Sequence, residues 1–439
     1  MPKNSALTTL QRTLSLTAQH YATSTIWLGF SGGLDSTVLL HAVSQHPDFA
    51  HRSVHAIHVN HGLSSQADQW QAHCQKQTQQ YGIHIQTVAL QTKPEAGESV
   101  EAWAREQRYQ AYAGKLAPGD VILLAHHADD QAETVLYRLC QGHGPKGLSG
   151  MPSAREFADQ RCLHRPFLSI SRTVLETYAK TYELKWIEDE SNADQRWSRN
   201  YLRHQVMPQL RERWPNVSAH IANTAILCGE AAEHMESWAT KVLHSADALG
   251  STILDIEVLQ PHKPAQQRLL LRHWLYMQLS QYPSNYTIQV IQHTVIPARQ
   301  DAQPCVVIGD YQVRRFQNKL YWIATRDLEP IVIDQPIAWD GLQPLVLPHN
   351  LGTITREQLH TQGLKLDALD WQQVSIRFRQ GGERCQPHGR THTQSLKKLM
   401  QDYKIPPWQR DRMPLLFCGD SFVMAIGGWI CHGFSRWLK

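Results

Sequence analysis

The first 140 residues alternate between short apolar runs and longer amphipathic segments. The apolar runs have the length of buried strands, at residues 24–29, 54–59, 83–90 and 121–125. The segments that follow them have the length or periodicity of helices, at about residues 35–45, 65–81, 99–115 and 129–139. Apolar strands that alternate with helices are typical of a parallel sheet covered on both faces. The pattern therefore predicts a doubly wound α/β domain, whose ligands bind beyond the carboxyl ends of the strands.

The rest of the chain follows other patterns. Residues 142–165 are rich in glycine, proline and arginine and predict a loop. The stretch from residue 211 to about 279 is mostly helical in pattern, whereas residues 303–325 predict two strands around a turn. Residues 326–350 contain four prolines, which is typical of a linker. We therefore predict four parts: an α/β domain at 1–215, a mainly helical domain at 216–325, a linker at 326–350 and a small α+β domain at 351–439.

Composition narrows the class of protein. Of 439 residues, 42% are hydrophobic and 19% are charged, which is typical of a folded chain. No run of apolar residues is long enough for a transmembrane helix, and the N-terminus lacks the compact apolar stretch of a secretory signal. The eight cysteines are dispersed without a CxxC pair, so we expect neither a zinc ribbon nor a disulfide framework. These features together predict a cytoplasmic protein without a membrane partner.

The positive charge is concentrated near the C-terminus. The formal net charge is +4, but residues 371–412 alone carry nine Lys or Arg and three acids, a net +6. This excess favours a phosphate-rich partner, although an ordinary solvated surface would have the same composition.

The clearest chemical motif lies between the first predicted strand and helix. Its residues are Ser31, Gly32, Gly33, Leu34, Asp35 and Ser36. Glycines let a phosphate approach the backbone, and the start of a helix offers N–H donors. A carboxylate among them makes sense if Asp35 holds a metal ion that screens the phosphates. The spacing is not that of a Walker A loop.

A second cluster follows the strand at 121–125 and therefore lies at the same edge of the sheet. It reads His126-His127-Ala128-Asp129-Asp130-Gln131-Ala132-Glu133. On a helix Asp130 and Glu133 are neighbours, so together they can bind a metal or a substrate cation. Carboxylates that only complement the start of a helix are the alternative.

Arginines form two further candidate groups. Arg199 and Arg203 are spaced to share one helix face and to clamp a phosphate, unless they pair with the acids at 188–190. Arg105, Arg108 and Tyr109 lie on a predicted helix with Glu101, where a surface ion pair is the simpler interpretation.

The loop motif is the signature of the PP-loop, or N-type ATP pyrophosphatase, family. The chain resembles these enzymes, which implies an adenine-nucleotide α-hydrolase-like fold and cleavage of ATP between its α and β phosphates. The order of SGGLDS, AREQRY, HHADDQAET, RPFL, EDESN and RNYLR is similar to that of the tRNA(Ile)-lysidine synthase family, as is the tail at 384–414. One departure is Glu190, where that family commonly has proline.

This resemblance implies ATP-dependent ligation of free lysine to C2 of the wobble cytidine in the CAU anticodon of tRNA(Ile). ATP would bind at residues 31–36, with Mg²⁺ at Asp35. Asp130 and Glu133 would bind L-lysine, and Arg199 and Arg203 would complete the catalytic set. The middle domain and the tail would hold the tRNA, the tail through Arg384, Arg390, Lys397 and Lys398.

Three other functions stay open at this point. A tRNA thiolase of the same superfamily would need a reactive cysteine or CxxC pair, and Cys140 is a lone candidate. A small-molecule adenylating ligase would not need the basic tail. A tRNA-binding protein with a degenerate loop conflicts with the intact Ser31, Asp35 and Ser36. The sequence leaves the general base open, and it neither supports nor opposes a homodimer.

Overall fold

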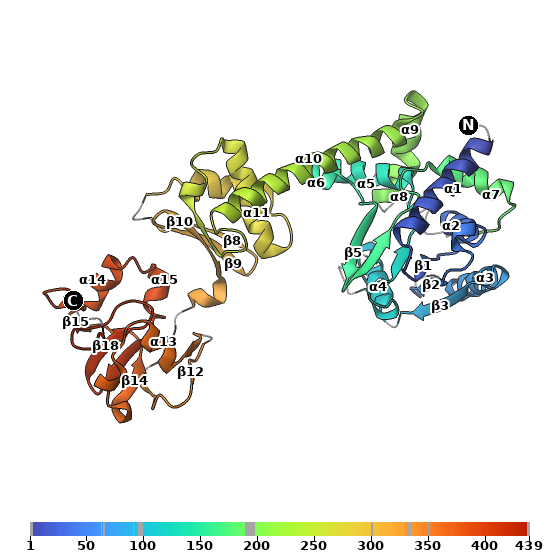
Figure 1. The fold of residues 1–439 in the computed structure, drawn as a ribbon. Coiled ribbons are helices and arrows are strands. Elements are labelled where there is room, and N and C mark those ends of the chain that lie inside the picture. The colour runs from blue at the N-terminus through green and yellow to red at the C-terminus, as the bar shows by residue number, and fades with distance from the viewer. Residues whose placement is uncertain are drawn as a thin grey trace. The chain divides into compact units, whose positions relative to one another are not determined.

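In a computed structural model, the chain forms two compact units, Met1–Ser237 and Trp238–Lys439 (Figure 1). The structure describes residues 3–62, 64, 66–90, 92–94, 100–188, 198–299, 302–329, 331, 333, 335–349 and 351–436. Within this described part, none of the helices combines the length and the apolarity needed to cross a membrane.

The first unit is built on a six-stranded sheet. Its strand order is β3 (His84–Ala89), β2 (Val54–Asn60), β1 (Ile26–Gly29), β4 (Val121–Leu123), β6 (Arg161–His164) and β5 (Ala154–Ala158). All neighbouring strands are parallel except β5, which runs antiparallel to β6. The central strands are almost wholly buried, because apolar side chains on both of their faces pack under helices.

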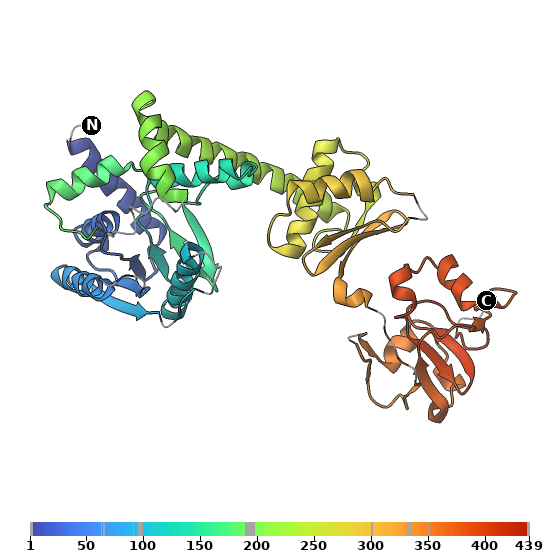
Figure 2. The ribbon, with the colours of Figure 1, turned by 180° about the vertical axis from the view of Figure 1, so that it is seen from behind.

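Helices cover both faces of this sheet (Figures 1 and 2). One face packs against α1 (Lys3–His20), α2 (Leu34–Ser44) and α7 (Arg172–Thr181) in a core that contains Leu10, Leu39 and Leu175. The other face packs against α4 (Val100–Lys115) around Trp27 and Tyr112. The predicted doubly wound α/β domain is confirmed.

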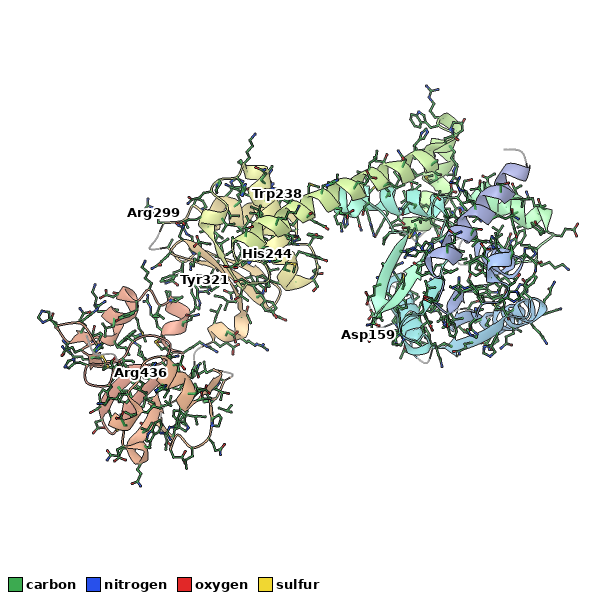
Figure 3. All side chains as sticks on the ribbon, in the orientation of Figure 1. Asp159, Trp238, His244, Arg299, Tyr321 and Arg436 are labelled. Atoms are coloured by element: carbon green, nitrogen blue, oxygen red, sulfur yellow. A yellow bond between two sulfur atoms is a disulfide. The ribbon has the colours of Figure 1, made fainter. Side chains whose placement is uncertain are left out.

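The prediction of a loop at residues 142–165 is wrong. This segment contains the short helix α6 (Pro145–Leu148) and the hairpin β5–β6, which extends the main sheet by two strands. The hairpin turns at Asp159 and Gln160, which both have positive φ, and Asp159 marks its tip in Figure 3. The apolar pattern did not predict these two strands. They lie at one side of the sheet, where exposed polar residues interrupt that pattern.

The middle of the chain is helical with a small sheet. The long helix α10 (Val217–Ser245) is followed by α11 (Pro264–Leu279) and α12 (Asn285–Val290), and Trp274 lies fully buried in their core. An antiparallel sheet has the order β7 (Ile253–Asp255), β10 (Lys319–Ala324), β9 (Tyr311–Phe316) and β8 (Cys305–Ile308). Tyr321, labelled in Figure 3, lies in β10. Residues 303–325 thus form three strands where two were predicted.

The C-terminal part is α+β, as predicted. Its main antiparallel sheet has the order β11 (Ile337–Ala338), β14 (Val374–Arg377), β17 (Leu415–Cys418) and β18 (Ser421–Ala425). Two short pairs, β12 (Leu345–Val346) with β13 (Thr353–Ile354) and β15 (Arg384–Cys385) with β16 (Gln394–Ser395), flank it. The helices are α13 (Arg356–Thr361), α14 (Leu396–Asp402) and α15 (Pro407–Arg410).

Two features of this part bear on the predictions. A disulfide links Cys385 to Cys431, although the dispersed cysteines had suggested none. Both cysteines pack in the core beside α14, so residues 46 positions apart meet through the fold and not through a sequence motif. The predicted linker holds β11 and β12, and the domain boundaries stay predictions.

Candidate active site

The PP-loop motif occupies the turn between β1 and α2. Gly32 has φ +82°, a conformation that strongly favours glycine. A Cβ at this position would lie 3.0 Å from the Cys74 Sγ, and the Gly32 carbonyl accepts a hydrogen bond from the Ile187 amide at 2.9 Å. Residues from α3 (Ala67–Gln80) and from the segment after α7 therefore hold the loop closely at Gly32.

Two hydroxyls complete the loop. The Ser31 and Ser36 Oγ atoms are 3.0 Å apart, and Ser36 Oγ also donates to the Gly33 carbonyl at 3.1 Å. Gly33 is the extended N-cap of α2 and has no side chain to cap the helix. The first amides of this 11-residue helix therefore remain available to bind an anion.

Asp35 lies in the first turn of α2 with 32% of its side chain exposed. Its Oδ2 is 3.6 Å from the His127 Nε2, whereas its Oδ1 is buried without a hydrogen-bond partner. An orphaned carboxylate oxygen beside a phosphate-binding loop fits Mg²⁺, which accepts carboxylate, phosphate and water oxygens. Among the described residues no cluster of three or more His, Cys, Asp or Glu could by itself hold a metal. The cation would therefore take most of its ligands from the nucleotide and from water.

His127 connects this loop with α5 (Ala128–Cys140). It is 1% exposed and caps α5: its Nδ1 accepts from the Asp130 amide, and its own amide donates to the Asp130 Oδ2 at 3.1 Å. Its Nε2 lies 3.4 Å from the Asp130 Oδ2. Burial alone would lower the pKa of His127, but the carboxylates of Asp130 and Asp35 outweigh it, so the pKa is raised.

Asp130 and Glu133 share one face of α5, and both contact Arg203. The Arg203 Nε donates to the Glu133 Oε1 at 2.7 Å, and its Nη2 donates to the Glu133 Oε2 and to the Asp130 Oδ1, each at 2.8 Å. Burial would raise the pKa of Asp130, but the neighbouring His127, His126 and arginines lower it, so the carboxylate stays ionised. The pair of acids and Arg203 form a largely buried ionic cluster.

Arg199 lies beside this cluster, in the short helix α8 (Ser198–Tyr201). Its Nη2 is 3.9 Å from the Asp130 Oδ1, and its Nε is buried without a partner among the described residues. Arg203 follows in a π-helical turn, Leu202–Val206. The alternative was that Arg199 and Arg203 pair with the acids at 188–190. Both arginines instead have carboxylate partners in α5, and no ion pair with Glu188 is observed; residues 189 and 190 lie outside the described part.

The sequence did not distinguish the role of Asp129 from that of Asp130. Asp129 points to other helices: its Oδ2 accepts from the Arg172 amide at the start of α7, and its Oδ1 accepts from Ser218 Oγ in α10 and from Arg211 in α9 (Met207–Arg213). This carboxylate fixes α5 in place. The only sequence signal was a second Asp in the first turn, which does not reveal partners up to 89 residues away.

Sequence positions far apart thus meet at one edge of the sheet. Asp35 follows β1, Asp130 and Glu133 follow β4, and Arg199 and Arg203 lie in the segment after α7. His127 and Arg203 join them.

The four basic residues predicted to bind tRNA lie close together in the second unit. Arg384 in β15 is paired in register with Ser395, which caps α14, the helix that carries Lys397 and Lys398. Arg390 Nη1 and Lys398 Nζ both bind Asp402, at 2.8 and 3.4 Å. Arg384, Lys397 and Lys398 are exposed. Asp402 therefore neutralises part of the positive charge of this surface.

Comparison with known proteins shows the family. The PP-loop domain matches residues 6–210, the TilS substrate binding domain matches residues 254–321, and the TilS substrate C-terminal domain matches residues 374–438. A tRNA(Ile)-lysidine synthase of Coxiella burnetii is 39% identical over 94% of this chain and 90% of its own. One of Escherichia coli O157:H7 is 40% identical over 95% of both chains.

Among solved structures, the U34-tRNA thiolase NcsA of Methanococcus maripaludis is similar over 52% of this chain and 80% of its own, at 17% identity and a TM-score of 0.43. The match to the curated relatives extends through all three parts of the chain at about 40% identity. The PP-loop identifies an ATP-using enzyme, and the chain belongs to the tRNA(Ile)-lysidine synthase family.

Proposed function

We propose that this enzyme ligates free L-lysine to C2 of cytidine 34 in the CAU anticodon of tRNA(Ile), forming lysidine and releasing pyrophosphate and AMP. The modified anticodon would read AUA in place of AUG. The observation that carries this proposal is the convergence at one sheet edge of a nucleotide loop with the acids Asp35, Asp130 and Glu133. Family membership supplies the tRNA and the reaction.

In the first step the O2 atom of cytidine 34 attacks the α-phosphate of ATP, and the bond to the β-phosphate breaks. The amides at the start of α2 and the hydroxyls of Ser31 and Ser36 bind the phosphates. Mg²⁺ at Asp35 would neutralise charge on the departing pyrophosphate. Arg199, whose Nε has no described partner, would stabilise the charge that develops on the reacting phosphate.

In the second step the ε-amine of lysine attacks C2, and AMP departs with the former O2 atom. Before attack the ammonium loses one proton, and a second proton leaves after the new C–N bond forms. Asp130 and Glu133 carry two negative charges, which Arg203 and, at 3.9 Å from Asp130, Arg199 offset, so a lysine ammonium would compete with these guanidiniums for the carboxylate oxygens. A lysine ammonium would share the carboxylates with Arg203, and either acid can then accept its proton.

The whole reaction is tested by transfer of label. Purified protein is mixed with ATP, Mg²⁺, radiolabelled lysine and a CAU-anticodon tRNA(Ile) transcript, and label is counted in the precipitated RNA. ATP-dependent incorporation that is lost in Asp35→Ala, and absent with a transcript that lacks the wobble cytidine, supports the proposal. Pyrophosphate release without incorporation would refute lysine as the nucleophile, and no tRNA-dependent pyrophosphate release would refute the tRNA reaction.

A further inference from the structure

Arg165 is an unusual buried charge. It follows β6 directly and is only 2% exposed. Its Nη1 donates to the Pro152 carbonyl at 2.7 Å, but its Nε is buried without a partner, and no carboxylate of the described residues forms an ion pair with it. A guanidinium buried without a counter-charge is costly, because it loses its hydration and gains no ionic partner.

Two further arginines lie around the same tyrosine. The Arg155 Cζ is 4.8 Å from the centre of the Tyr109 ring, and the Arg105 Cζ is 5.2 Å from it. Burial would raise the pKa of Tyr109, but the charge of Arg105, a hydrogen bond with Arg155 and the charge of Arg165 outweigh it and lower the pKa. Burial also lowers the pKa of Arg165 to about 10, with Arg105 and Arg155 adding to this effect and Tyr109 opposing it.

The cluster is open to solvent on one side. Arg105 is exposed, Arg155 and Tyr109 are half-buried, and Arg165 lies beneath them. Within the described part of the chain, none of the three arginines has an acidic partner within ion-pair distance. Three positive charges therefore converge on one tyrosine, with an accessible face and with no carboxylate partner among the side chains that the structure describes.

The cluster lies at the catalytic edge of the sheet but apart from the nucleotide loop. Arg165 follows the carboxyl end of β6, Arg155 is near the start of the antiparallel β5, and Arg105 is in the first half of α4. In the sheet order, β6 is separated from β1 by β4. At about 4.8 Å per strand, the cluster is displaced by roughly 10 Å from the strand that carries the PP-loop. An anion bound here would be a second one, distinct from the phosphates at α2.

We propose that Arg105, Arg155 and Arg165, assembled around Tyr109, form a subsite for a phosphodiester of the tRNA anticodon loop next to the reacting cytidine. The inference rests on the proposed function, because it assigns this anion to the same RNA. An RNA strand suits three positive charges better than the single carboxylate of lysine, since each nucleotide brings a further phosphate. The forked guanidinium of Arg155 can hold two phosphate oxygens.

The test is a binding measurement without ATP or lysine. The dissociation constant of the CAU-anticodon tRNA(Ile) transcript is measured against salt concentration for wild type, Arg155→Gln, Arg155→Lys and the double variant Arg105→Gln/Arg155→Gln. Lys115→Gln is the matched control, because it removes one charge from the exposed end of α4, about 15 Å along the helix from Arg105. Arg165 itself is left intact, since its replacement would disturb the core.

Arg155→Gln is expected to weaken binding about tenfold and to reduce the salt slope by about 0.7, the value for one lost contact with a single strand. Arg155→Lys should keep the slope and lose part of the affinity, because the charge remains while the fork is lost. The double variant should lose more affinity for the tRNA and more of the salt slope than Arg155→Gln. Lys115→Gln should match wild type in both quantities. Thermal unfolding of each variant separates weak binding from loss of fold.

A modified RNA locates the phosphate. An anticodon stem-loop with a neutral methylphosphonate 5′ or 3′ of cytidine 34 should bind wild type more weakly at one of the two positions. At that position the same substitution should have little further effect on Arg155→Gln, as expected for two halves of one contact. Equal losses in wild type and variant at both positions would refute the contact.

The KM values for tRNA, lysine and ATP distinguish a tRNA phosphate site from a site for the carboxylate of lysine. The KM for tRNA should rise in Arg155→Gln, with the KM values for lysine and ATP unchanged. A raised KM for lysine with unchanged tRNA binding would overturn the proposal in favour of a carboxylate site, and unchanged tRNA binding in the double variant would overturn it outright. If wild type binds this tRNA but forms no lysidine, the proposed reaction fails while the binding results still decide the subsite.

Discussion

Arg203→Met removes the only guanidinium that hydrogen-bonds both Asp130 and Glu133 among the described residues. The Glu133 side chain is 2% exposed and that of Asp130 12%, so the variant leaves two buried carboxylates without this partner. Removal of one partner from a buried ion pair costs about 3–5 kcal/mol. Because 24% of the Arg203 side chain is exposed and water can enter its place, we expect the lower end, about 3 kcal/mol. For a unit of this size that loss lowers the Tm by about 6–12 °C.

Calorimetry of the full chain measures this loss, and the transition of the first unit is identified as the one that ATP shifts. The pKa of Asp130 is lowered in the fold, so its contribution to the free energy of unfolding is present above its unfolded pKa and is lost as the pH falls through the folded value. The difference between wild type and Arg203→Met should therefore shrink on acidification. Adding Glu133→Gln to the variant should restore part of the loss, because one buried charge is removed. A loss below about 1 kcal/mol at neutral pH, or one that grows in acid, would refute the reasoning.

Three further predictions concern neighbouring positions. Asp35→Asn should lower tRNA-dependent pyrophosphate release by about 100-fold or more with an unchanged Tm, because a metal ligand is lost while the fold is kept; a parallel fall in Tm would instead indicate a structural role. Gly32→Ala should raise the dissociation constant for ATP. A φ of +82° costs a non-glycine residue about 1–2 kcal/mol, and the new methyl group would meet Cys74. Titration with ATP measures the dissociation constant, and an unchanged value would contradict the prediction. Ser218→Ala should lower the free energy of unfolding by about 1–3 kcal/mol, because it removes a donor to the buried Asp129 oxygen. The kcat should stay within about twofold of wild type. A large fall in kcat without loss of stability would instead indicate a catalytic role for Ser218.

The sequence predicted the elements whose pattern is local. β1, β2 and β4 are continuous apolar runs, and the PP-loop motif lies between β1 and α2, so the catalytic edge followed from the general rule for parallel sheets. The β5–β6 hairpin was missed because Arg155 and Glu156 interrupt the apolar pattern at the border of the sheet. Its position matters for function, since it brings Arg155 beside Arg165.

The partners of the charged residues could not be predicted in the same way. Asp129 and Asp130 are adjacent and chemically identical, yet one binds Arg172, Arg211 and Ser218 and the other faces His127 and Arg203. The start of α5 sets the direction of the Asp130 side chain, and three later helices set that of Asp129. A short stretch of sequence around the two residues cannot predict these contacts. The Cys385–Cys431 disulfide is a similar case, because only the fold brings the two residues together.

The distances in sequence between these partners have a consequence for synthesis of the chain. The PP-loop makes its contacts with the neighbouring β2 early, within the first 60 residues, and the hydrogen bond from the Ile187 amide follows later. Glu133 and Asp130 meet Arg203 only 70 and 73 residues later, and Asp129 meets Ser218 after 89 residues. During vectorial synthesis the acids of α5 therefore emerge well before the residues that neutralise and fix them. A nascent chain makes the β1–β2 contacts of the nucleotide loop first and orders the cluster of acids last, so assembly of the catalytic edge requires the chain to have been made as far as the start of α10.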